Sequence, residues 1–231
     1  MLGSRSNGDA MVVRAAQRVP SGRCPPGGDL QSKPVTSAAL DRWRNQRAKQ
    51  LDELVDAHVA ISGTAAGRRW ATAELNRALI LRLASQFQGF ARDLHGETAI
   101  TFGELAHPTD PVLARVVATG LQVNRQLDHK NAQEDSLSSD FSRVGIQLWA
   151  EMDARHRRTA ARRLHLRAFN RARNGLAHDD QRAVAEVLAA GYRMDLAGIR
   201  QWRAALDGLA DTMDDVLAAH LGRLFKVARP W

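Results

Sequence analysis

Three observations predict an all-α fold for this chain. Hydrophobic residues make up 44% of its 231 positions, which is enough to build a core. Ala and Leu dominate, whereas β-branched and aromatic residues are sparse, and this composition favours helices over strands. Apolar residues recur at spacings of three and four along several long segments, which is the period of amphipathic helices. We therefore expect one all-α bundle domain over residues 37–231.

Residues 1–36 lack this periodicity and are rich in Pro and Gly, so we expect a disordered basic tail there. A start codon assigned too far upstream is the alternative. The tail holds Cys24, the single cysteine, which excludes an internal disulfide and a multi-cysteine zinc site. The apolar residues 11–13 are too few for a signal-peptide core, and no run reaches the roughly 18 residues that span a bilayer. These features predict a cytoplasmic protein without a membrane segment.

The first two helices follow from caps and apolar stripes. Thr36 or Ser37 can cap the first helix with a side-chain hydroxyl, and Ser62-Gly63 ends it. The second helix is expected over residues 67–95, closed by Gly96. At about thirty residues it is long for a globular helix and suits a bundle.

The middle of the chain is predicted to be less regular. Residues 97–109 form a loop in this prediction, and Asp110-Pro111 then provides a cap and a proline at the first helical position. The third helix is expected to cover 112–127. The polar stretch 128–140 is predicted to be an exposed linker, and a short apolar segment follows at 144–152.

The last part of the chain predicts a short helix over 180–190 and a long one over 196–225. The long helix carries apolar residues at a strict 3-4-3-4-3 spacing, which predicts a stripe that packs on another helix, within the chain or across a dimer. The stripe consists of Ile199, Trp202, Leu206, Leu209, Met213 and Val216. Three histidines are expected to have no catalytic role. His58 and His220 fall on apolar stripes, and His129 lies in the polar stretch.

An Arg-rich run over 155–173 contains eight arginines and no acidic residue. Arg163, Arg167 and Arg171 lie four residues apart, so on a helix they form one cationic stripe. Because its like charges repel, this stripe predicts an anionic partner, with RNA as the candidate and a plainly solvated face as the alternative. The formal charge of +8 supports an anionic partner.

The run ends in the motif Arg173-Asn174-Gly175-Leu176-Ala177-His178. About one Arg-x4-His pair is expected by chance in a sequence of this composition, but requiring Asn after the Arg lowers this to roughly a few hundredths. Residues five apart on an unbroken helix point about 140° away from each other. We therefore expect Gly175 to break the helix, with Asn174 bracing the turn, so that His178 folds back toward Arg173.

Such a pair can cleave RNA without a metal or cofactor. His178 would act as a general base or acid for the ribose 2′-OH, and Arg173 would stabilise the negative charge that gathers on the phosphate oxygens. The expected product is a 2′,3′-cyclic phosphate. DNA lacks the 2′-OH and should not be cut.

The long helices, the Arg-rich helix and the Arg-Asn-x-x-x-His motif together resemble the HEPN domain family over residues 37–231. The resemblance implies an antiparallel bundle of four to six helices, a homodimer, and a metal-independent endoribonuclease of toxin–antitoxin or defence systems, with a cognate antitoxin as a possible protein partner. It implies Arg173 and His178 as the catalytic pair and Asn174 as their support. It also implies a site composed of two motifs across the dimer.

Three other readings stay open. Some HEPN domains only bind RNA or act as scaffolds, and Arg173 and His178 would then be a structural pair at a helix end. His178-Asp179 matches the dipeptide of HD-type metal phosphohydrolases, which need further His and Asp ligands on neighbouring helices. A DNA-binding regulator would need a helix-turn-helix, for which no convincing segment is found.

Overall fold

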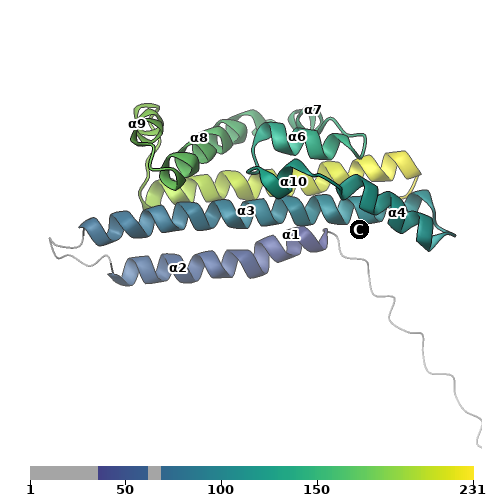
Figure 1. The fold of residues 1–231 in the computed structure, drawn as a ribbon, viewed down its shortest axis with the longest axis horizontal. Coiled ribbons are helices and arrows are strands. Elements are labelled where there is room, and N and C mark those ends of the chain that lie inside the picture. The colour runs from purple at the N-terminus through teal and green to yellow at the C-terminus, as the bar shows by residue number, and fades with distance from the viewer. Residues whose placement is uncertain (1–35, 62–68) are drawn as a thin grey trace, which may run out of the picture. The chain divides into compact units, whose positions relative to one another are not determined.

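The computed structural model describes residues 36–61 and 69–231, and every regular element in these ranges is helical (Figure 1). The all-α prediction is therefore confirmed there. The predicted tail up to residue 35, the predicted first-helix end at 62–63 and the predicted second-helix start at Gly67 lie outside the described residues. No helix in these ranges is long and apolar enough to cross a membrane. In chain order, the elements are α1 (Ala38–Arg42), the π-helical segment η1 (Trp43–Arg47), α2 (Ala48–Ile61), α3 (Arg69–Ala106), α4 (Pro111–Gln122), α5 (Gln126–His129), α6 (Glu134–Ser142), α7 (Leu148–Arg155), α8 (Thr159–Ala177), α9 (Gln181–Ala189) and α10 (Leu196–Phe225).

The long helix α3 is the centre of the fold and packs against α1, α2, α8 and α10 (Figure 1). The predicted cap at the start of α1 is confirmed, because Oγ of Ser37 accepts a hydrogen bond of 3.0 Å from the backbone N–H of Leu40. Helix α10 has the predicted bounds, and all six residues of its apolar stripe are buried in the chain's own core. The stripe therefore packs within the chain, which is the first of the two predicted alternatives.

Helix α3 does not end at Gly96 but continues to Ala106, so the predicted loop over 97–109 is wrong for 97–106 and right for 107–109. The residues after Gly96 make contacts that need a helix. Both carboxylate oxygens of Glu97 accept backbone N–H groups at the start of α1, at 2.8 and 2.9 Å. Ala99 is fully buried. A glycine costs a helix only about 1 kcal/mol, and these contacts outweigh that cost.

The segment that follows α4 is also more ordered than predicted. Asp110 caps α4 as expected, but α4 ends at Gln122, because Asn124 adopts a left-handed conformation with φ of 56°. Helices α5 and α6 occupy much of the stretch 128–140 and its approach, where Leu127 and Leu137 are fully buried. The prediction of an exposed linker is wrong for this stretch, although its His129 is exposed as predicted.

Gly175 does not break α8, which continues to Ala177. Gly175 is buried where α9 approaches α8, and a Cβ atom there would lie 3.1 Å from Cγ2 of Val184. The chain turns later, at Asp179, which has φ of 52°, and the backbone N–H of Asp180 then donates to the carbonyl of Gly175 at 2.8 Å. The glycine thus serves close helix packing, and the predicted break is wrong.

A buried histidine makes the stability of the fold depend on pH. His95 is fully buried, and its Nε2–H donates a hydrogen bond of 3.0 Å to the backbone oxygen of Asp140. Burial lowers the pKa of His95 from 6.5 to about 4, and the nearby Arg125 and Arg143 act in the same direction, whereas Asp140 opposes them. The folded state therefore binds fewer protons than the unfolded state between these two values. Stability is fully present above pH 6.5 and is lost as the pH falls toward 4.

We expect the free energy of unfolding to fall by about 2 kcal/mol through His95 when the pH is lowered from 7 to 5. Urea unfolding at several pH values measures this change. His95→Gln keeps an N–H donor and does not titrate, so its unfolding free energy should lack this part of the pH dependence. A variant that retains the full dependence would assign it to other groups. His129→Gln changes an exposed histidine and is the control.

Candidate active site

The predicted stripe Arg163, Arg167 and Arg171 lies on α8, and each guanidinium meets a carboxylate of another helix. Arg163 and Arg167 pair with Glu134 of α6 at 2.8 and 2.6 Å, and Arg171 pairs with Glu186 of α9 at 2.6 Å. Burial acts to raise the pKa of Glu134, but the hydrogen bonds from Arg167 and Arg163 outweigh burial and leave this pKa below its ordinary value. Carboxylates of neighbouring helices therefore offset the repulsion that was expected within the stripe. Its role in guiding RNA stays a prediction.

Arg173, near the C-terminal end of α8, has different surroundings. Its side chain is half-buried, and no described carboxylate lies within ion-pair distance of its guanidinium. The guanidinium instead donates a hydrogen bond of 3.1 Å to Oδ1 of Asn174, and the same oxygen accepts one of 2.7 Å from the side-chain amide of Asn131. Asn174 thus links Arg173 to the segment before α6, and it does not brace a turn at Gly175. Arg173 keeps its charge available to an incoming anion.

A cavity of about 360 Å³ opens beside Arg173, between α3, α8 and residues 127–132. Two buried rings, Phe87 and Phe169, belong to its lining. One acidic side chain among the described lining residues, Asp128, is neutralised by Arg125 at 2.9 Å, and this hydrogen bond lowers the pKa of Asp128. The remaining charged and amide groups come from Gln88, Arg92, His129, Lys130, Asn131, Asn170 and Arg173. The cavity is therefore suited to an anion that also accepts hydrogen bonds.

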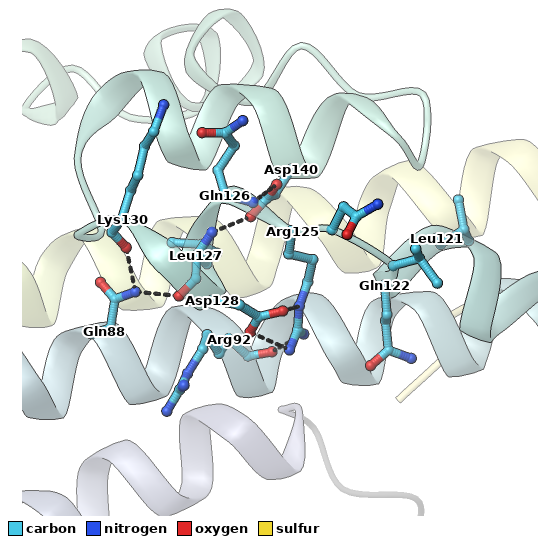
Figure 2. A network of polar contacts seen from close by, with 12 residues as sticks. Gln88, Arg92, Leu121, Gln122, Arg125, Gln126, Leu127, Asp128, Lys130 and Asp140 are labelled. Carbon is cyan, nitrogen blue, oxygen red and sulfur yellow. Dashed lines mark hydrogen bonds and ion pairs between the residues drawn. The ribbon is translucent and has the colours of Figure 1, made fainter.

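Residues 127–130 form one wall of the cavity and are fixed to α3 and α6 by the network in Figure 2. The carboxylate of Asp140 accepts hydrogen bonds of 2.8 Å from the backbone N–H groups of Gln126 and Leu127, at the start of α5. From the other side, the Nε2 group of Gln88 donates to two backbone carbonyls of the same segment (Figure 2). This wall is thus held from two helices, although α5 itself has only four residues.

His178 is exposed at the C-terminal end of α8 and does not line this cavity. Because α8 is continuous through Gly175, Arg173 and His178 leave its axis about 140° apart. No hydrogen bond joins the two side chains in the described part of the chain. One copy of the protein therefore presents the two predicted catalytic side chains to different sides of α8.

Sequence reasoning missed His129 and Lys130 as neighbours of Arg173, because it placed both in an exposed linker. A signal was present in the buried residues Leu137 and Phe141, which lie four apart and indicate a short helix within and just beyond the polar stretch. The long-range approach of Asn131 to α8 has no sequence signal of this kind.

The arrangement can bind a phosphate-like anion between a fixed guanidinium and the cationic wall, and proton transfer can follow if an imidazole reaches the same anion. In the described residues, no group of three or more His, Cys, Asp or Glu side chains is placed to hold a metal ion. A comparison of the chain with protein-family models, curated proteins and solved structures finds no match.

Proposed function

We propose that this protein is a metal-independent endoribonuclease that works as a homodimer. Arg173 of one copy would hold the phosphodiester and stabilise its transition state, and His178 of a second copy would remove the proton from the 2′-OH. Asn174 orients the guanidinium. The cellular setting that we propose is a toxin or defence system, with RNA as substrate and an antitoxin as a protein partner.

The observation that carries this proposal is the half-buried Arg173, which lines a cationic cavity and has no carboxylate partner among the described residues. Arg171, two residues away on the same helix, is by contrast neutralised by Glu186. The Arg-Asn-x-x-x-His motif supplies the second reason, because it adds a histidine next to this site in the sequence. The resemblance to the HEPN family remains part of the proposal.

The divergence of Arg173 and His178 on one continuous helix is the reason for a site shared by two copies. It also favours a second candidate function, an RNA-binding scaffold without catalysis. The scaffold predicts RNA binding that is unchanged in His178→Ala and no cyclic-phosphate ends.

Mixing two inactive variants separates these possibilities. We expect Arg173→Ala and His178→Ala each to slow cleavage of RNA in EDTA by at least about 100-fold. In a shared site, a mixed dimer retains one complete pair, formed by Arg173 of one copy and His178 of the other. An equal mixture of the two variants should therefore recover about a quarter of the wild-type rate after subunit exchange. Gel analysis of labelled RNA measures this rate.

Three results would contradict parts of the proposal. Variants that each keep wild-type activity would place both residues outside catalysis. Inactive variants with no recovery would place each pair within one copy. If the wild-type protein cleaves no RNA, the RNA-binding scaffold is the candidate function that remains. Growth arrest on expression that disappears with Arg173→Ala would support the toxin role.

A further inference from the structure

This inference rests on the proposed function. Cleavage of RNA through its 2′-OH requires two proton transfers. One group removes the proton of the 2′-OH as this oxygen attacks phosphorus. A second group donates a proton to the 5′-oxygen as its bond to phosphorus breaks. The products are a 2′,3′-cyclic phosphate and a 5′-hydroxyl, without consumption of water. The motif offers a single histidine, His178, so one of the two roles has no assigned residue.

His129 is the histidine that lines the same cavity as Arg173. It is exposed at the end of α5, and it is followed by Lys130, which also lines the cavity. No other histidine belongs to the lining of this cavity among the described residues. A histidine can donate a proton near neutral pH, whereas an arginine or an ordinary lysine holds its proton too tightly.

The surroundings of His129 fit a placed catalytic group better than a surface histidine in a linker. The backbone on its N-terminal side is held by the carboxylate of Asp140, and Gln88 holds the backbone on both sides of it through hydrogen bonds to Leu127 and Lys130 (Figure 2). Proton transfer needs a donor within hydrogen-bond reach of the leaving oxygen, and a fixed backbone provides such placement.

We propose that His129 is a further catalytic residue, the general acid that protonates the leaving 5′-oxygen of the phosphodiester held by Arg173. His178 of the second copy then acts as the base for the 2′-OH. The two histidines thus reach the scissile phosphate from opposite sides, one from the cavity wall and one from the neighbouring copy.

The test compares two RNA substrates in the full-length protein. One is an ordinary oligonucleotide, and the other carries sulfur in place of the leaving 5′-oxygen at one position. A thiolate leaves without a proton, so it does not need a general acid. We expect His129→Ala to slow cleavage of the oxygen substrate by about 100-fold or more, and cleavage of the sulfur substrate only a few-fold. It should also remove the fall in rate on the alkaline side of the pH profile.

His107→Ala is the matched control, because His107 follows α3 and does not line the cavity. We expect it to cleave both substrates at wild-type rates. Equal losses on the oxygen and sulfur substrates would show that His129 acts in binding or folding, and an unchanged rate would remove it from the reaction. Either result would overturn this inference while the wild type still cleaves RNA. Absence of cleavage by the wild type would instead overturn the proposed function.

Discussion

Replacing Arg173 by alanine is expected to lower kcat/KM for RNA cleavage by about 100- to 1000-fold, mostly through kcat. The guanidinium lies at the cavity without a carboxylate partner among the described residues, so its charge is available to the phosphate. An interaction that strengthens as charge gathers on the phosphate oxygens affects the transition state more than the bound substrate. Arg173→Lys keeps the charge but loses the planar pair of donors, and we expect an intermediate rate.

Arg171 provides a control on the same helix. It lies two residues from Arg173, it is exposed, and Glu186 neutralises it. We expect Arg171→Ala to raise KM for RNA at most a few-fold and to leave kcat unchanged, because the paired Arg171 would at most guide the RNA. Equal losses of kcat in the two variants would mean that total charge on α8, and not the position of Arg173, determines activity.

The comparison of these two arginines shows which parts of the site the sequence could predict. The spacing of Arg163, Arg167 and Arg171 correctly placed them on one side of a helix. Their carboxylate partners lie 10 to 33 positions away in the sequence, and periodicity carries no information about such pairs. The sequence singled out Arg173 because of the motif, but its available charge became evident only from the structure.

The fold was predictable where local signals and packing agree. Helix α10 has both a side-chain cap at Asp195 and an uninterrupted apolar stripe, and its bounds match the prediction. The errors lie at Gly96 and Gly175, where a local helix-breaking signal opposes tertiary contacts. A penalty of about 1 kcal/mol for a helical glycine is small beside the burial of neighbouring side chains. Both helices therefore continue.

The prediction for residues 128–140 is wrong for a related reason, because the ordered structure of this stretch depends on one buried polar residue. Asp140 is fully buried, and its carboxylate accepts two backbone N–H groups. A polar residue in a polar stretch is expected to be exposed. The hydrogen-bond partners of Asp140 are backbone N–H groups, and the sequence carries no signal that identifies them. The same stretch carries the cavity wall, so the least predictable segment is the one closest to the proposed chemistry.

Asp140→Ala is expected to lower the free energy of unfolding by about 3 kcal/mol. It removes the acceptor of two charge-assisted hydrogen bonds, and the N–H of the fully buried Leu127 has no access to water as a replacement. Urea unfolding measures the loss. Asp135→Ala on the same helix removes an exposed carboxylate and should cost less than about 1 kcal/mol.

The same variant tests whether the network serves the site as well as the fold. Without Asp140, α5 loses both of its hydrogen bonds to α6, so His129 and Lys130 are placed less firmly. We therefore expect the folded variant to lose at least about 10-fold in kcat for RNA at a temperature where it remains folded, because proton transfer depends on placement within about 1 Å. A destabilised variant with full activity would separate the two roles, and the stability of α5 would then have no bearing on catalysis.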